Sequence, residues 1–245
     1  MTTDAPLFSI ITVTKDNLKG FLATRESIEA QSCKNYEWIV IDGNSSDGTK
    51  DILPAGAVSE DDQGLYHAMN KGIARARGDY LLFLNAGDTL ADMDILATLG
   101  RAAKEQPDFI YGDSLETGGT YKKARPHDKA AWGMFTHHQA MLYRRERIGG
   151  LRYDTGYKIA ADYDFTARFL KGELSVHYIP TAICVFETGG ISQRHMTSGR
   201  TEQFRARKSH GMQPWMNMAV FAGQTAAAAI KRLSPGIYAL SNCWI

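Results

Sequence analysis

An uninterrupted apolar run at residues 80–84 ends in a small, polar, acid-bearing turn at residues 85–88. Because the run shows no alternation of apolar and polar positions, it predicts a central strand covered on both faces in an α/β sheet. Ligands of such sheets bind just beyond the carboxyl ends of the strands. The turn therefore stands where a ligand is expected, although Asn, Gly and Asp are also ordinary turn residues.

Similar patterns nearer the N-terminus predict two further strands with a helix between them. Residues 7–14 are rich in β-branched side chains, and residues 36–41 form a second apolar run before a polar loop at 42–49. Between these runs, apolar positions from Leu18 to Ile28 recur with helical spacing. A strand, a helix and a strand in this order predict a right-handed parallel unit.

A second helix is expected immediately before the central strand, because Leu65, Met69 and Ile73 fall on one helical face. Lys71 lies elsewhere on this helix and could reach a diphosphate. A basic side chain on a helix is more often only solvated, so both interpretations stay open.

The later part of the chain shows shorter patterns. They predict the following elements: a strand at 107–113, an apolar strand-like run at 140–143, a short helix at 166–170, and two last strands at 174–179 and 182–186. The pair His137-His138 precedes the run at 140–143. In a strand these two side chains point to opposite faces, so at most one of them addresses a given pocket.

After residue 190 the composition changes. Basic side chains gather between residues 194 and 210, and a mostly small, apolar stretch follows at 218–230. Such a stretch either lies in a membrane interface beside basic residues that meet anionic lipid, or packs as a helix on the core. We therefore divide the chain into a catalytic domain at 1–190 and a helical, basic and apolar tail at 191–245.

Composition limits the remaining choices. The chain has 245 residues, of which 44% are hydrophobic and 22% charged, enough for one α/β core and an appendage. A net charge of +1 argues against a nucleic-acid partner. Cys33, Cys184 and Cys243 lie far apart without metal-ligand spacing, which favours a reducing compartment over a disulfide framework. With no signal-peptide pattern and no apolar stretch of ~20 residues, a cytoplasmic protein is expected, with contact at the cytoplasmic face of the inner membrane as an open alternative.

Two strand ends carry candidate chemistry. Asp42 follows the second predicted strand, and a carboxylate there can accept hydrogen bonds from a base N–H or from ribose hydroxyls. Asp88 offers oxygen to a hard divalent cation, and Gly87 permits close approach of a ligand. The chain contains no GxGxxG after the first strand and no GxxxxGK[ST], so dinucleotide-binding and P-loop sites lose their main support.

Four segments, taken together, resemble the successive motifs of the family 2 inverting glycosyltransferases, which have the GT-A fold. They lie at residues 10–17, 38–49, 68–73 and 84–88, and the resemblance continues more weakly to about residue 190. Each motif alone is weak, but their order and spacing make the match specific. The resemblance implies a GT-A, Rossmann-like α/β fold with a mixed sheet flanked by helices. It also implies transfer of a hexosyl group from a nucleotide sugar, expected to be a UDP-sugar, to a lipid-linked or oligosaccharide acceptor in cell-surface polysaccharide synthesis.

The resemblance also implies roles for individual residues. Asp42 would contact the nucleotide base, Asp88 would bind Mn²⁺ or Mg²⁺, and Asp162 would be the catalytic base. Further positions are assigned to the donor side and the acceptor side: Thr12, Thr14, Lys71, Asn85 and Ala86 to the donor, and Asp113, His137, His138 and Gln139 to the acceptor.

The chain departs from the family pattern in two places. Asn85 and Gly87 occupy positions often held by Asp, so Asp88 is the only carboxylate in the turn, and cation binding is expected to need oxygens of the nucleotide diphosphate. Ala161 stands where the family often has Glu. Asp is also a good helix N-cap, so capping is the alternative role for Asp162 or Asp164, and Asp164 is the second candidate for the base.

Two other functions remain open from the sequence. A sugar nucleotidyltransferase can share this sheet, but it needs a glycine-rich, basic loop after the first strand, and residues 14–17 are not one. A non-catalytic module that binds nucleotide sugars or glycans is harder to exclude, because the acidic turn is reduced to one carboxylate.

Overall fold

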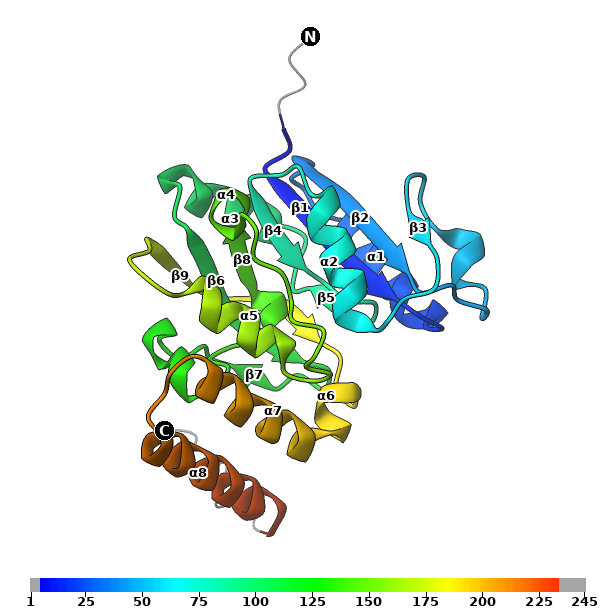
Figure 1. The fold of residues 1–245 in the computed structure, drawn as a ribbon. Coiled ribbons are helices and arrows are strands. Elements are labelled where there is room, and N and C mark those ends of the chain that lie inside the picture. The colour runs from blue at the N-terminus through cyan, green and yellow to red at the C-terminus, as the bar shows by residue number, and fades with distance from the viewer. Residues whose placement is uncertain (1–4, 234–245) are drawn as a thin grey trace.

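The computed structural model describes residues 5–233, and within them the chain forms one mixed sheet with helices on both faces (Figure 1). The strands are β1 (Phe8–Thr14), β2 (Tyr36–Asp42), β3 (Val58–Ser59), β4 (Tyr80–Phe83), β5 (Thr89–Leu90), β6 (Phe109–Glu116), β7 (Tyr121–Lys122), β8 (Met141–Arg144) and β9 (Val176–Phe186). The α-helices are α1 (Leu18–Glu29), α2 (Leu65–Arg75), α3 (Ile95–Ala102), α4 (Arg145–Ile148), α5 (Ala161–Phe169), α6 (Ile191–Arg194), α7 (Met196–Ser209) and α8 (Pro214–Leu233). Short 3₁₀ turns are η1 (Thr49–Ile52), η2 (Ala103–Glu105), η3 (His127–Trp132) and η4 (His138–Ala140). Cys243 and the last part of the expected tail lie outside the described residues.

The strand order is β3-β2-β1-β4-β8-β6-β9-β5, with β7 paired to β6. The strands β1 and β2 are parallel, as the sequence pattern predicts, and β3 and β4 run parallel to them, whereas β8 is antiparallel to both of its neighbours, β4 and β6. Because β8 runs the opposite way, the segment that precedes it lies at the edge where β4 ends. This arrangement brings residues 137–140 next to the turn at residues 85–88.

Each face of the sheet is covered by its own helices. On one face, α2 and α5 pack in a cluster that includes Leu81 and Phe83 of β4, and both helices lie in front of the sheet in Figure 1. On the other face, α1 and α3 pack in a cluster that includes Tyr80 and Leu82. The strand β4 is therefore buried on both sides, which is why its sequence shows no polar alternation.

Three local predictions were wrong. The two strands expected at 174–179 and 182–186 are one strand, β9 (Val176–Phe186); its register with β6 shifts near Pro180, which cannot donate a ladder hydrogen bond. The expected helix at 166–170 begins earlier, because α5 starts at Ala161 and has Ala160 at its N-cap position. The segment before β8 is the 3₁₀ turn η4, so His138 lies in a turn and not in a strand.

The helices after β9 form a layer of their own at the lower end of the molecule in Figure 1, where α8 packs against α7. Phe204 meets Phe221 edge-on with ring centroids 5.5 Å apart. Arg207, 1% exposed, donates from Nε to Asn217 Oδ1 at 2.7 Å. In the described chain no helix is both long and apolar enough to cross a bilayer.

Candidate active site

The candidate site lies where the parallel strands end. Asp42 closes β2, and the turn at residues 85–88 follows β4. Both strands flank β1 in parallel register, so their carboxyl ends lie on the same edge of the sheet. Asp42 and Asp88 therefore lie at one edge of the sheet.

The turn at residues 85–88 is fixed from behind by Thr24 of α1. Its hydroxyl donates to the Asp88 carbonyl oxygen at 2.7 Å and accepts from the Gly87 N–H at 3.0 Å. Gly87 has a φ of +106°, a conformation that favours glycine. The backbone of the turn is thus held in one shape before any ligand arrives.

Asp88 is buried at the base of this turn and is 4% exposed. Its Oδ2 accepts from Gln139 Nε2 at 2.6 Å, and its Oδ1 accepts from the backbone N–H of Glu187 at 2.9 Å. Burial, with a smaller contribution from the nearby Glu187 charge, raises the pKa of the Asp88 carboxyl to about 7, although the two hydrogen bonds oppose the increase.

The donor atoms around Asp88 fit a hard divalent cation. Gln139 Oε1 and Asn85 Oδ1 are buried side-chain oxygens without a hydrogen-bond partner in the described structure. A buried oxygen without a partner is costly, and oxygen ligands are those that Mg²⁺ and Mn²⁺ prefer. Within residues 5–233 no group of three or more His, Cys, Asp or Glu side chains could hold a metal ion, so amide oxygens would have to complete the site.

His138 lies between the turn and Asp162. Its Nε2 is 3.4 Å from Asn85 Nδ2, and its Nδ1 is 3.6 Å from Asp162 Oδ2. Burial lowers the pKa of His138 to about 3, so the ring is neutral at physiological pH. The structure therefore brings together four of the predicted residues, Asn85, Asp88, His138 and Asp162, from three segments of the chain.

Asp162 lies in the first turn of α5 but does not cap the helix. Its Oδ1 accepts from the backbone N–H of Tyr163 at 2.8 Å. Burial raises the pKa of its carboxyl to about 6, against backbone N–H groups and the Tyr66 hydroxyl, which lower it. A carboxylate with this pKa is a stronger proton acceptor than an ordinary aspartate and is still ionised at neutral pH.

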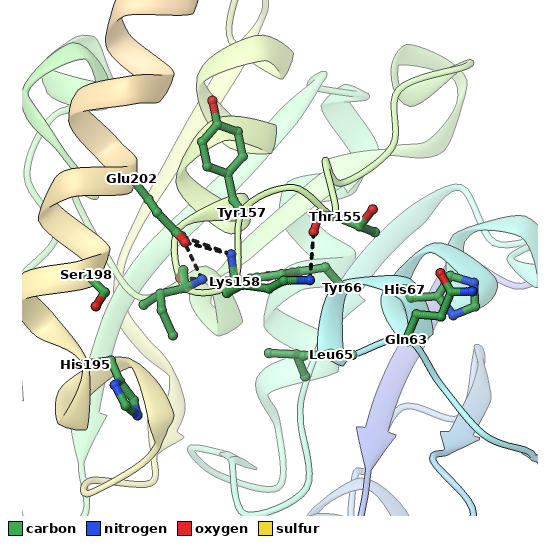
Figure 2. A pocket seen from close by; sticks show the side chains of 12 residues that line it. Gln63, Leu65, Tyr66, His67, Thr155, Tyr157, Lys158, His195, Ser198 and Glu202 are labelled. Atoms are coloured by element: carbon green, nitrogen blue, oxygen red, sulfur yellow. Dashed lines mark hydrogen bonds between the residues drawn. The ribbon is translucent and has the colours of Figure 1, made fainter.

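Glu202 of α7 binds the backbone that leads into α5. Its carboxylate accepts from the consecutive backbone N–H groups of Lys158, Ile159 and Ala160 at 2.8–3.1 Å. Figure 2 shows the bonds to Lys158 and Ile159. These N–H groups hold the pKa of Glu202 below its usual range, although burial opposes them. The loop that leads into Asp162 is thus tied to the C-terminal helices.

A cavity of about 490 Å³ opens beside this loop (Figure 2). Its walls are the start of α2, the loop at 155–159 and α7, with Tyr66 and Glu202 on its lining. The Tyr66 hydroxyl donates to the Ile159 carbonyl oxygen at 2.7 Å. None of the predicted donor-side residues lines this cavity, so it lies beside the strand-end site and not over it.

Of the remaining predicted donor-side residues, the side chains of Asp42 and Thr12 form hydrogen bonds within the protein, whereas that of Thr14 forms none within residues 5–233. Asp42 is fully buried, and its carboxylate accepts from Ser45 and Ser59. The Thr12 hydroxyl donates to the Leu84 carbonyl oxygen. Thr14 Oγ1 is buried without a partner in the described structure.

Lys71 and Ala86 complete the predicted donor side. Lys71 forms ion pairs with Glu60 at 2.8 Å and with Asp62 at 2.5 Å. Although burial lowers it, these carboxylates hold the pKa of Lys71 above its usual range. The Ala86 carbonyl oxygen accepts from Asn17 Nδ2 at 3.1 Å.

Two of the predicted acceptor-side residues point elsewhere. The Asp113 carboxylate accepts from Tyr121 Oη, from Tyr178 Oη and from the backbone N–H of Ala124 at 2.6–2.8 Å. His137 stacks on Phe186, with ring centroids 4.3 Å apart. His138 and Gln139, in contrast, reach the turn that follows β4.

Strand ends that carry a buried acid and a glycine-containing acidic turn, with an acid on a helix nearby, form the candidate site of an α/β fold of the GT-A class. The model of the family described as glycosyl transferase family 2 matches residues 9–170. The chain therefore belongs to this family, is a glycosyltransferase, and confirms the resemblance and the fold expected from its motifs.

Individual relatives agree with this assignment. The chain is 34% identical over 204 residues to a PGL/p-HBAD biosynthesis glycosyltransferase of Mycobacterium tuberculosis, covering 77% of this chain and 80% of that protein. Its fold is similar to S. aureus TarS 1–349 in complex with UDP-GlcNAc, with a TM-score of 0.70, 16% identity, and coverage of 89% and 71%. It is also similar to the mannosyltransferase PcManGT from Pyrobaculum calidifontis in complex with GDP-Man and Mn²⁺, with a TM-score of 0.63, 20% identity, and coverage of 98% and 80%.

Proposed function

We propose that this glycosyltransferase inverts the anomeric centre of a nucleotide sugar and uses Asp162 as its base. The observation that carries the proposal is the position of Asp162. Its carboxylate has a raised pKa and lies 3.6 Å from a neutral histidine that in turn contacts Asn85 of the turn after β4. The proton acceptor therefore faces the strand edge where the donor is expected.

The donor is a nucleoside diphosphate sugar. Asp42 and Thr14 lie at the ends of β2 and β1, where open α/β sheets hold nucleosides. The structural relatives carry UDP-GlcNAc or GDP-Man in the complexes described, which supports a nucleotide sugar as the donor class and leaves a UDP-sugar as our choice. The diphosphate would then face the turn at residues 85–88.

In the reaction, an acceptor hydroxyl attacks the anomeric carbon from the side opposite the diphosphate. The Asp162 carboxylate takes the hydroxyl proton as the new C–O bond forms, and the bond to the diphosphate breaks with its electron pair on the departing oxygen. Asp88, with Asn85 and Gln139 oxygens, would hold Mn²⁺ or Mg²⁺, which supplies positive charge for the departing diphosphate. General-base assistance of this kind contributes roughly 10²–10⁴-fold to the rate.

The acceptor approaches from the side of the cavity between α2 and α7. The loop that Glu202 holds lines this cavity and ends shortly before Asp162 in the chain. This proximity supports use of the cavity by the part of the acceptor that lies beyond the reacting hydroxyl. The mycobacterial relative is named a PGL/p-HBAD biosynthesis glycosyltransferase, and the acceptor of our proposal is lipid-linked or an oligosaccharide at a membrane surface.

Release of nucleoside diphosphate tests this function. Purified protein is incubated with a panel of UDP- and GDP-sugars, with and without extracts that contain lipid-linked acceptors. Acceptor-dependent release with a product of inverted anomeric configuration by NMR supports the proposal. Pyrophosphate exchange would instead indicate a nucleotidyltransferase, and donor binding without any turnover would indicate a binding module.

A further inference from the structure

Asp88 is the only carboxylate within the turn after β4, yet a second carboxylate lies against the same turn. We propose that Glu187, just beyond the end of β9, is the second acidic ligand of the divalent cation at Asp88. The inference rests on the proposed function in so far as the same turn faces the donor diphosphate. It concerns cation binding alone and can be tested without turnover.

Gly87 provides the first observation. A Cβ placed on Gly87 would overlap the Glu187 carboxylate and would lie 2.8 Å from its Cδ. The Glu187 carboxylate therefore occupies the space into which a side chain at residue 87 would project. An acidic side chain at residue 87 would thus place its negative charge where the Glu187 carboxylate already lies.

The sheet holds Glu187 in this position. The strand β5 directly follows Asp88 and pairs with β9, with Thr89 opposite Val185. The backbone N–H of Glu187 donates to Asp88 Oδ1 at 2.9 Å, which extends the contact between the two segments beyond the last ladder pair. The strand register therefore fixes the backbone of Glu187 beside Asp88, and the Glu187 carboxylate lies against Gly87 of the same turn.

Two buried oxygens provide the independent observation that a ligand belongs here. Gln139 is 1% exposed, and its Nε2 bonds Asp88 while its Oε1 has no partner in the described structure. Asn85 Oδ1, two residues from Gly87 in the same turn, is also buried without a partner. Burying such oxygens without a partner is costly, and a cation would remove that cost.

The complete donor set is therefore two carboxylates and two amide oxygens. All four are hard oxygen ligands, and several such ligands with water or phosphate oxygens complete the shell of Mg²⁺ or Mn²⁺. Two adjacent carboxylates repel each other when no cation lies between them. Glu187 is an exposed residue, and its carboxylate makes no ion pair within residues 5–233, so it has no evident role in stabilising the fold.

Isothermal titration with Mn²⁺ alone, on the full chain without donor or acceptor, tests the inference. The variant Glu187→Gln keeps the shape of the side chain and removes its charge. Glu173→Gln, at an exposed glutamate in the loop before β9, removes the same charge away from the turn and serves as the matched control. Asp88→Asn is the positive control for loss of the site, with circular dichroism to verify its fold.

We expect Glu187→Gln to weaken Mn²⁺ binding by at least about tenfold, since even residues that only support metal ligands cost 10–100-fold. Glu187→Asp should recover part of the affinity, and Glu173→Gln should bind as the unsubstituted protein does. Equal affinity in Glu187→Gln and the unsubstituted protein overturns the inference, as does an absence of Mn²⁺ binding by the unsubstituted protein. Either result leaves the glycosyltransferase proposal intact, because that proposal is decided by acceptor-dependent release of nucleoside diphosphate in a separate assay.

Discussion

Asp162 and Asp164 lie two positions apart on α5, but their surroundings give them different chemistry. Asp164 is 4% exposed and forms ion pairs with Arg168 and His210 at 2.6 and 2.8 Å. Burial raises its pKa, but the two partners together hold the pKa of its carboxyl below the usual range. A carboxylate held in this way is a poor proton acceptor, so the second candidate for the base has a structural role.

Asparagine at each position should separate the two roles. Asp162→Asn keeps the size of the side chain but cannot accept a proton, so kcat should fall by roughly 10²–10⁴-fold while donor affinity stays unchanged. Asp164→Asn should instead lower the free energy of unfolding by about 1–3 kcal/mol, with a much smaller effect on kcat. Kinetics and chemical denaturation on the same preparations measure both. Near-normal kcat in Asp162→Asn would contradict its assignment as the base.

The pH dependence of turnover follows from the raised pKa of Asp162. Since this pKa is about 6, the carboxylate is ionised above pH 6 and progressively protonated below it. A protonated carboxyl cannot take the acceptor proton, so kcat/KM should fall about tenfold per pH unit below pH 6. A pH–rate profile with a saturating cation checks this, and the acidic limb should disappear in the residual activity of Asp162→Asn.

Asp42 should affect donor binding more than chemistry. Asp42→Asn keeps the shape but weakens hydrogen bonds to a charged acceptor, which are worth about 1.5–3 kcal/mol, so donor KM should rise roughly tenfold or more. The effect on kcat should be smaller, as expected for lost uniform binding. Because Ser45 and Ser59 also bond this carboxylate, the free energy of unfolding must be measured alongside. A large fall in kcat at unchanged KM would refute the role.

Sequence patterns predicted residues whose signal is local and missed those whose contacts are distant. The turn at residues 85–88 was recognisable because an apolar run stops there abruptly. Thr24, Glu187 and Glu202 had no such signal, since their partners lie 63, 99 and 42–44 residues away. Lys71 was a donor-side candidate, but no local pattern indicates that two acids, Glu60 and Asp62, already pair with it.

At the scale of elements, the strands β1, β2 and β4 were predicted well, because β-branched and unbroken apolar runs mark them. The later elements were predicted less well. In β9 the register shift near Pro180 looks like a strand end in the sequence. The helix α3 was missed although Ile95, Leu96 and Leu99 fall on one helical face, and β5 has only two residues to signal it. The start of α5 could not be predicted, because the backbone N–H of its N-cap residue, Ala160, donates to Glu202, which lies on another helix.

The contact between α7 and the loop before α5 gives a prediction at this scale. Glu202→Gln removes the charge that three backbone N–H groups share, and each such hydrogen bond is worth about 1.5–3 kcal/mol. We expect amide exchange in residues 158–160 to accelerate at least tenfold and kcat to fall severalfold at unchanged donor KM. Hydrogen exchange by mass spectrometry with steady-state kinetics measures both effects. Glu26→Gln, at an exposed glutamate on α1, is the matched control.

At the scale of the whole molecule, the described part of α8 has one packed face and one exposed face. One face packs on α7 through Asn217 and Val220, which are 1% and 5% exposed. The opposite face exposes Trp215 and Met218, at 71% and 57%. Packing is thus observed, and contact with a membrane stays a prediction about the exposed face.

Substitution tests this face better than truncation, because removing α8 would also uncover the buried Arg207. The double variant Trp215→Ser and Met218→Ser should lose most of its cosedimentation with vesicles of phosphatidylcholine and phosphatidylglycerol, while turnover on a soluble acceptor is retained. Added salt should weaken binding of the unsubstituted protein, because exposed basic side chains are screened. Leu22→Ser with Met93→Ser, on other exposed apolar positions, is the control. Identical sedimentation of both double variants would leave α8 as a packing element.

The strand order also determines when, during synthesis on the ribosome, the protein can first become active. The strands β1, β2 and β4 can pair as soon as the first ninety residues have emerged, but β5, directly after Asp88, pairs with β9, which ends at Phe186. At ordinary elongation rates roughly 5–20 s separate these two strands. The parallel strands that carry Asp42 can therefore pair well before the turn at Asp88 receives its partners. If Asp42 holds the nucleotide as we propose, stalled or truncated chains that end before β9 should bind nucleoside without transferring sugar.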